Sequence, residues 1–155
     1  MKIALIGHGG TGKTTYGPII AKHWNLEWFD SDSEIEKEVG ESIVEIFFHY
    51  GEKEFRRMER EVITKLILKD NIVLSTGGGS IVNDETRSDL KNFDKVIWLK
   101  ASAETIWERI KNTSRPSVSF GIEKVKNILC QREPLYREIA TMEVDTEFEI
   151  DMSKW

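Results

Sequence analysis

Short apolar runs alternate with longer amphipathic stretches from the beginning of the chain. Continuous apolar runs bounded by turn residues are typical of buried strands, whereas apolar residues that recur every three to four positions indicate helices. The apolar runs predict strands over residues 2–6, 27–29, 72–74, 96–99 and 142–145. The helical periodicity predicts helices over residues 13–24, 33–39, 42–50, 52–69, 84–91, 103–111 and 122–139.

This alternation favours an α/β fold in which helices cover both faces of a parallel sheet. We therefore expect a three-layer α/β/α architecture with five parallel strands. No internal repeat or linker interrupts the pattern, so residues 1–155 are expected to form one domain. Ligands bind such sheets at the carboxyl ends of the strands. Glycine clusters follow the first and the third predicted strands, so we expect the ligand site at these two loops.

The composition restricts the partners that the protein can have. A net charge of -5 gives no basic surplus to neutralise a polynucleotide backbone, so we expect no nucleic-acid partner. No apolar run is long enough to span a bilayer, and the apolar segment before Gly7 is too short for a signal peptide. The single cysteine, Cys130, excludes an intrachain disulfide. We expect a cytoplasmic protein in which Cys130 is a buried or half-buried packing residue.

The segment after the first predicted strand reads GHGGTGKT (residues 7–14), which has the form G-x-x-x-x-G-K-[ST]. In this motif backbone N–H groups surround phosphate oxygens, and the following helix directs its positive dipole end toward them. The motif lies between a predicted strand and a predicted helix, as it requires, which favours a nucleotide site over an ordinary glycine-rich turn. Lys13 is expected to reach the β- and γ-phosphates, and Thr14 to bind Mg²⁺. His8 is interpreted as a tolerated side chain within the loop rather than a catalyst.

Further motifs follow the phosphate loop in a defined order. They are FDSD at 29–32, SIVEIF at 42–47, GEKEFR at 51–56, GGG at 77–79, RP at 115–116 and REPLY at 132–136. In this order and at these spacings, over about residues 1–146, they resemble the motifs of shikimate kinases. The resemblance implies a P-loop kinase fold similar to nucleoside monophosphate kinases, with a substrate-binding helical segment at about residues 32–60 and a lid at about residues 113–121.

The same resemblance implies a reaction. ATP would phosphorylate the 3-hydroxyl of shikimate, with Mg²⁺, to give shikimate 3-phosphate for chorismate and aromatic amino acid biosynthesis. We expect the enzyme to be a monomer with no membrane partner.

Two aspartates after the second predicted strand receive roles from the resemblance. Asp30 would hold Mg²⁺ through water, because hard cations prefer oxygen ligands. Asp32 would accept a hydrogen bond from the attacking hydroxyl and take or steer its proton. From the residues alone an alternative stays open, which is that Asp32 or Ser31 caps the following helix.

Two arginines, Arg56 and Arg132, are the carboxylate clamp that the resemblance implies. The planar guanidinium group suits this task because it pairs with a carboxylate through two hydrogen bonds. Glu59 lies three residues after Arg56, a spacing that permits an orienting ion pair on one helix. Arg57 and Arg60 are assigned instead to the solvated face of that helix.

The remaining expected site residues serve the nucleotide or the acceptor. Arg115 would close over the γ-phosphate, or else be an ordinary loop cation, and Phe47 and Phe55 would form apolar walls or pack in the core. The expected catalytic residues are Lys13, Asp32 and Arg115. The expected ATP-binding residues are Gly9, Gly10, Thr11, Gly12, Lys13, Thr14, Thr15, Arg109 and Arg115, with Arg109 a candidate to stack on adenine. The expected substrate-binding residues are Asp32, Phe47, Phe55, Arg56, Gly77, Gly78, Gly79 and Arg132, and the metal-binding residues are Thr14 and Asp30.

Two other functions stay open at this point. One is another small-molecule kinase, such as a gluconate kinase, which would share the phosphate loop but not need the paired arginines. The other is a catalytically silent relative that binds nucleotide or shikimate and regulates a partner. The second alternative arises because Ser117-Val118 follow Pro116 in the lid, the stretch from Arg115 to Arg132 is short, and residues 147–155 are too few for a long terminal helix.

Overall fold

Five parallel strands form one sheet in the order β2-β3-β1-β4-β5, in a computed structural model that describes residues 1–115, 118 and 121–155. The strands are β1 (Lys2–Ile6), β2 (Glu27–Asp30), β3 (Ile72–Ser75), β4 (Lys95–Lys100) and β5 (Met142–Asp145). The helices are α1 (Lys13–Trp24), α2 (Ser31–Val39), α3 (Ile43–Leu66), α4 (Asp84–Leu90), α5 (Ala103–Ile110) and α6 (Gly121–Ile139). Two 3-10 turns, η1 (Ser80–Val82) and η3 (Met152–Lys154), complete the described elements.

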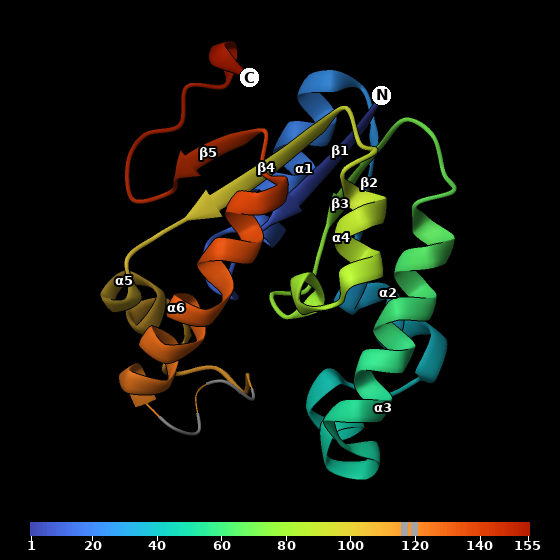
Figure 1. Ribbon diagram of the computed structural model, residues 1–155, viewed down its shortest axis with the longest axis vertical. Coiled ribbons are helices and arrows are strands. Elements are labelled where there is room, and N and C mark those ends of the chain that lie inside the picture. Colours follow the sequence, from blue (N-terminus) through green and yellow to red (C-terminus); the bar gives the residue numbers. More distant parts are fainter. Residues whose placement is uncertain (116–117, 119–120) are drawn as a thin grey trace.

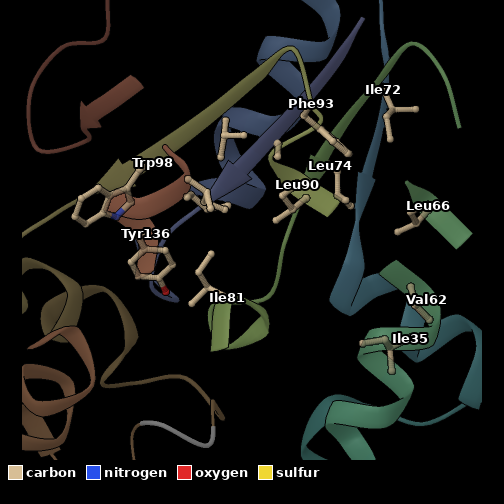
Figure 2. Packing of buried hydrophobic residues seen from close by; sticks show 14 of the residues in the cluster. Ile35, Val62, Leu66, Ile72, Leu74, Ile81, Leu90, Phe93, Trp98 and Tyr136 are labelled. Atoms are coloured by element: carbon tan, nitrogen blue, oxygen red, sulfur yellow. The ribbon is translucent and has the colours of Figure 1, made fainter. Parts of the chain in front are cut away.

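Helices cover both faces of the sheet, with α1 behind it and α4 and α6 in front in the view of Figure 1. The central strand β1 shows why both faces need cover, because successive side chains of a strand point to opposite faces. Ile3 and Leu5 belong to the apolar cluster under α1, whereas Ala4 and Ile6 belong to the larger cluster on the opposite face. Figure 2 shows part of that larger cluster, in which side chains from α3, α4 and α6 meet the sheet. The prediction of a three-layer α/β/α fold with five parallel strands is confirmed.

The helix boundaries differ from the sequence prediction in a few places. Helix α3 joins the two helices expected at 42–50 and 52–69, but Gly51 breaks it with non-helical backbone angles (φ 80°, ψ 171°). The helix ends at Leu66, and η1 was not predicted at all. The expectation that Cys130 is buried is wrong, because this residue of α6 is exposed. No helix within the described part of the chain is long and apolar enough to cross a membrane.

The expectation that Arg60 belongs to a solvated face is also wrong. Its side chain is only 22% exposed, and its Nη2 donates to Asp89 Oδ2 at 2.7 Å, on α4. Arg57 does lie at the surface, where it pairs with Glu54 and Glu61 of its own helix. Arg60 therefore joins α3 to α4 rather than facing solvent.

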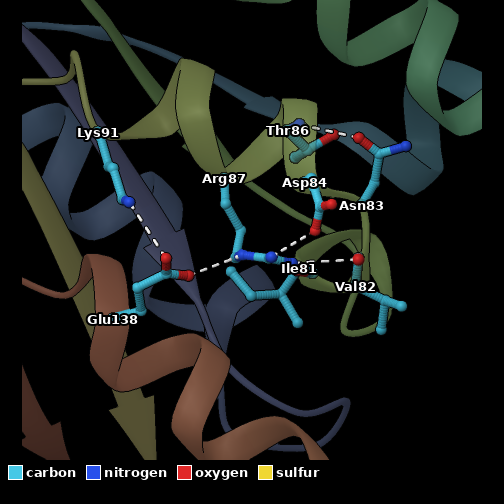
Figure 3. A network of polar contacts seen from close by, with 8 residues as sticks. All are labelled: Ile81, Val82, Asn83, Asp84, Thr86, Arg87, Lys91 and Glu138. Atoms are coloured by element: carbon cyan, nitrogen blue, oxygen red, sulfur yellow. Dashed lines mark hydrogen bonds and ion pairs between the residues drawn. The ribbon is translucent and has the colours of Figure 1, made fainter.

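A polar network around Arg87 joins α4 and η1 to α6 (Figure 3). Arg87 Nη1 donates to the carbonyl oxygens of Ile81 at 2.8 Å and Val82 at 3.1 Å. Its Nε donates to Glu138 Oε2 on α6 at 2.8 Å, and Lys91 pairs with the other oxygen of Glu138. Because η1 directly follows the three glycines at 77–79, this network holds the end of that glycine segment against α6.

Candidate active site

A cavity of about 400 Å³ lies at the carboxyl ends of β1 and β3, where the sequence predicted a ligand site. Its lining combines the phosphate-loop segment with residues from several other loops and helices. The lining residues are Gly9, Gly10, Gly12, Lys13, Thr14, Thr15, Tyr16, Asp30, Asp32, Thr76, Gly77, Gly78, Arg109, Arg115 and Thr146. A wider depression of about 520 Å³ lies near the chain start and the end of α1, around His23 and Asn71, but it gathers no comparable set of charged groups.

The phosphate-loop segment has the backbone shape that anion binding requires. Gly10 (φ 89°) and Gly12 (φ 104°) adopt left-handed conformations that other residues rarely adopt, and Gly12 is the N-cap of α1. Lys13 is buried and donates from Nζ to the carbonyl oxygens of Gly7 at 2.5 Å and His8 at 2.9 Å. Burial, together with the nearby charge of Arg115, lowers the pKa of Lys13 to about 8. An anionic phosphate in the loop would therefore relieve the cost of holding this charge.

The ring of His8 is buried inside the loop. Its Nδ1 lies 2.7 Å from the Gly9 carbonyl oxygen, which can only accept, so Nδ1 carries the proton of this contact. Burial lowers the pKa of His8 to about 4, and the charges of Lys13, Arg132 and Arg115 act in the same direction. His8 is therefore neutral near pH 7 and adds no charge beneath the loop.

Asp30 and Thr14 present neighbouring oxygen ligands at the mouth of the cavity. The Thr14 hydroxyl donates to Asp30 Oδ2 at 3.1 Å, while Asp30 Oδ1 accepts from the Ser33 N–H at 3.1 Å. Asp30 thus caps α2, so neither Ser31 nor Asp32 is the cap. The described residues contain no cluster of three or more histidine, cysteine or carboxylate side chains suited to a metal. A hydroxyl beside one carboxylate fits Mg²⁺, because this ion takes few ligands from the protein. Its other ligands are oxygens of phosphate groups and water.

Two carboxyl oxygens without hydrogen-bond partners converge on Gly77. Asp32 Oδ1 and Glu59 Oε2 are both buried and unpaired. A Cβ atom at Gly77 would lie 2.7 Å from the first oxygen and 2.8 Å from the second. Burial raises the pKa of Asp32 to about 6, as does the Asp30 carboxylate, while Lys13, Arg115 and Arg56 oppose the rise. Asp32 is therefore close to both the phosphate loop and the predicted arginine clamp.

The other two glycines of the turn are also tightly enclosed. A Cβ atom at Gly78 would lie 3.0 Å from the Gly9 nitrogen, and one at Gly79 would lie 2.6 Å from Arg56 Cζ. None of the three has positive φ. They are therefore required for space rather than for backbone conformation, and they bring the phosphate loop, Asp32 and Arg56 together.

Arg56 is oriented by Glu59, as the spacing predicted. Its Nη1 donates to Glu59 Oε1 at 2.9 Å, and the Glu59 side chain is only 4% exposed. Burial raises the pKa of Glu59 to about 7, against the opposing charge of Arg56. Glu59 was not predicted as a site residue, although its position three residues after Arg56 was a usable signal.

Arg132 and Arg115 add positive charge near the phosphate loop. The charge of Arg132 on α6 lowers the pKa of both Lys13 and His8, which places this guanidinium group near the loop. Arg115 is exposed, and its Nη1 lies 2.9 Å from where a Cβ atom of Gly9 would be. The expected lid at about 113–121 lies partly outside the described residues, at positions 116, 117, 119 and 120.

Of the remaining expected site residues, Arg109 lines the cavity, whereas Thr11, Phe47 and Phe55 are not part of its lining. Arg109 bridges the loop and the end of β5, because its Nη1 donates to the Gly10 carbonyl at 3.1 Å and to Thr146 Oγ1 at 3.0 Å. The Thr11 hydroxyl is engaged inside the loop with the His8 carbonyl at 2.8 Å. Phe47 packs against Phe55 with ring centroids 4.6 Å apart, and Phe55 is buried in the core. Phe55 is therefore a core-packing residue.

The fold and this cavity define a P-loop kinase. A sequence model of the shikimate kinase family matches residues 9–153. A shikimate kinase from Francisella tularensis subsp. holarctica is 46% identical over 148 residues, which are 93% of this chain and 84% of the relative. The chain therefore belongs to the shikimate kinase family, as its motifs predicted.

Solved structures agree with this membership. A shikimate kinase from Acinetobacter baumannii, in complex with shikimate, superimposes with a TM-score of 0.89 at 35% identity, covering 97% of this chain and 84% of that chain. A gluconokinase from Sinorhizobium meliloti superimposes with a TM-score of 0.61 at 17% identity, covering 96% of this chain and 83% of that chain. The second similarity shows a shared fold alone.

The raised pKa of Asp32 predicts a pH-dependent gain in stability for Asp32→Asn. The carboxyl ionises near 3.8 when exposed and near 6 in the folded protein, so its ionisation costs folding energy as the pH rises from about 4 to about 6. The ligand-free variant should exceed the wild type in free energy of unfolding by about 1–3 kcal/mol at pH 7, and by much less at pH 4.

Thermal or urea unfolding across this pH range measures the difference. Asp70→Asn is the control, because the Asp70 side chain is 84% exposed. A gain for Asp32→Asn that is the same at pH 4 and pH 7 would contradict the burial of an ionised carboxylate.

Proposed function

We propose that this protein transfers the γ-phosphoryl group of ATP to the 3-hydroxyl of shikimate, giving ADP and shikimate 3-phosphate. The observation that carries the proposal is the convergence of the phosphate loop, Asp32 and Arg56 around the glycine turn at 77–79. Shikimate carries a carboxylate and hydroxyl groups on one ring, so it needs a cation and hydrogen-bonding groups at fixed separation. Family membership and the shikimate complex of the A. baumannii relative support the same acceptor.

On the nucleotide side, the loop residues Gly9, Gly10, Thr11, Gly12, Thr15 would offer backbone N–H groups to the phosphates. Lys13 would leave the loop carbonyls and bind the β- and γ-phosphates, where its charge is compensated. Thr14 and Asp30 would hold Mg²⁺, which when bound neutralises phosphate charge. Arg109 is proposed to contact adenine with the face of its guanidinium group, because its N–H groups already bind Gly10 and Thr146.

On the acceptor side, Arg56 and Arg132 would bind the carboxylate, and Gly78 and Gly79 would offer N–H groups to the ring substituents. The Arg56–Glu59 pair fixes one guanidinium group before the substrate arrives, which lowers the entropy lost on binding. Phe47 is proposed to form an apolar wall of this pocket. Glu59 would thus act on the substrate through Arg56 and not by direct contact.

At the junction of the two sides, Asp32, which lines the cavity, would accept a hydrogen bond from the 3-hydroxyl through its carboxylate. As the hydroxyl oxygen bonds to the γ-phosphorus and the bond from that phosphorus to the β-bridging oxygen breaks, the hydroxyl proton passes to Asp32. Lys13 and Arg115 would stabilise the charge on the transferring group. Because the pKa of Asp32 is about 6, its carboxylate is largely ionised at neutral pH and able to accept the proton.

The alternative acceptors are less well supported. A gluconate-type acceptor is open-chain, and the likeness to the gluconokinase concerns the fold alone. A silent binding protein would not need Lys13, Asp32 and Arg115 together. We place the enzyme in the cytoplasm as a monomer that supplies chorismate biosynthesis.

A panel of acceptors tests the proposed function directly. With ATP and Mg²⁺, ADP release can be measured by a coupled assay for each acceptor. The kcat/KM for shikimate should exceed the kcat/KM for gluconate by at least about 100-fold. Equal use of gluconate would favour the other small-molecule kinase. Binding of shikimate without turnover would favour the silent relative.

Replacing Arg56 by lysine should weaken shikimate binding selectively. Lysine keeps the charge but loses the two-point geometry, so the KM for shikimate should rise about 10- to 100-fold while the KM for ATP stays within about three-fold. Arg57→Lys is the matched control, since the adjacent Arg57 lies at the surface, where it pairs with Glu54 and Glu61. Equal effects of the two variants on KM would reject the clamp.

Replacing Asp32 by asparagine should chiefly lower turnover. The amide keeps the size of the side chain but cannot take the hydroxyl proton, so kcat should fall at least about 100-fold with little change in the KM for ATP. Steady-state kinetics with saturating shikimate measure both constants. Near-normal turnover would show that Asp32 does not handle the proton.

A further inference from the structure

The hydroxyl of Tyr136 lies between the glycine turn and Arg132. Tyr136 is on α6 and is only 1% exposed, and its ring packs beside Trp98 with centroids 5.5 Å apart (Figure 2). Its hydroxyl donates to the Gly78 carbonyl oxygen at 2.6 Å. The hydroxyl therefore reaches out of the core to the backbone of the proposed acceptor site.

The charge of Arg132, one helical turn earlier on α6, acts on the same hydroxyl. Burial raises the pKa of Tyr136 to about 12, although the Arg132 charge opposes the rise, so the phenol stays protonated at neutral pH. A tyrosine hydroxyl has one proton to donate and lone pairs to accept with. The proton is engaged with Gly78, so the lone pairs of the hydroxyl are available to the nearby Arg132 guanidinium group.

This bond has a consequence for the next peptide N–H. In a planar trans peptide the carbonyl and the N–H point in opposite directions. Because the Gly78 carbonyl is directed toward Tyr136, the N–H of Gly79 is directed away from α6. Arg56 packs against Gly79. The peptide that joins Gly78 to Gly79 is therefore in contact with Tyr136 through its carbonyl and with Arg56 at Gly79.

Core packing alone does not account for the hydroxyl. A phenylalanine would provide the same ring against Trp98 without the cost of burying a polar group. Packing of η1 against α6 is already provided by Arg87, which binds the Ile81 and Val82 carbonyls and Glu138 (Figure 3). What the hydroxyl adds is a connection between one guanidinium group and the glycine turn.

We propose that Tyr136 is a positioning residue that holds Arg132 and the Gly78–Gly79 peptide in one relative geometry, and thereby sets the affinity for the acceptor. The proposal rests on the proposed function, because it assumes that Arg132 and the glycine turn bind shikimate. Tyr136 itself touches neither the carboxylate nor the transferring phosphoryl group.

Tyr136→Phe tests the role of the hydroxyl, because it removes one oxygen and keeps the ring that packs on Trp98. The dissociation constant for shikimate, measured by calorimetry, and the KM for shikimate should both rise about 3- to 10-fold, while the KM for ATP stays unchanged. Thr141→Val is the control, since it removes another hydroxyl that bonds to backbone, at Val96, away from the cavity. The control should alter thermal stability but not the affinity for shikimate.

A double-mutant cycle with Arg132→Lys separates positioning from general loosening of the fold. If Tyr136 acts through Arg132, the loss of affinity caused by Tyr136→Phe should be much smaller in the Arg132→Lys background. Additive losses, or a lower unfolding temperature with unchanged shikimate affinity, would overturn the proposal. Wild-type protein that neither binds nor phosphorylates shikimate would instead reject the proposed function, so the two failures are distinguishable.

Discussion

The glycine turn at 77–79 is the point at which the parts of the site are forced together. Each of its three positions is closed to a side chain by a different neighbour: the carboxyl oxygens at Gly77, the phosphate loop at Gly78 and Arg56 at Gly79. The turn follows β3, which pairs with β1 in parallel, so the carboxyl ends of both strands meet at the same edge. The close approach of a nucleotide-binding loop and an acceptor pocket therefore depends on three consecutive residues without side chains.

The charged groups around this turn favour the binding of a ligand and lower the stability of the ligand-free protein. Asp32 and Glu59 each keep a buried oxygen without a partner, and burial raises the pKa of both groups. Lys13 is buried with its ammonium group on loop carbonyls, at a lowered pKa. Buried groups with shifted pKa values are concentrated at functional sites, because a bound ligand supplies the hydrogen bonds and opposite charges that these groups lack in the free protein. An acceptor hydroxyl would satisfy Asp32 and an anionic phosphate would satisfy Lys13, whereas Glu59 would act through Arg56.

Much of the architecture could be predicted because local pattern and fold agree. The alternation of apolar runs and amphipathic stretches specified all five strands, and Gly51 marked the break in α3. The spacing of Arg56 and Glu59 on one helix predicted their ion pair, which the structure contains. Contacts between distant segments were not accessible in this way, since Arg60 and Asp89, or Tyr136 and Gly78, meet only through the packing of separate helices and loops. The exposure of Cys130 was missed for the same reason, because the sequence does not say which face of α6 is covered.

The proposed function depends on one spatial arrangement, in which a single acceptor lies between the arginine clamp and the carboxylate of Asp32. A crystal structure of the protein with shikimate and a non-hydrolysable ATP analogue tests this claim most directly. The shikimate carboxylate should contact both Arg56 and Arg132, and the 3-hydroxyl should lie about 2.6–3.2 Å from a carboxylate oxygen of Asp32, facing the γ-phosphate position. Shikimate bound with its carboxylate away from both arginines, or with the 3-hydroxyl turned from Asp32, would contradict it.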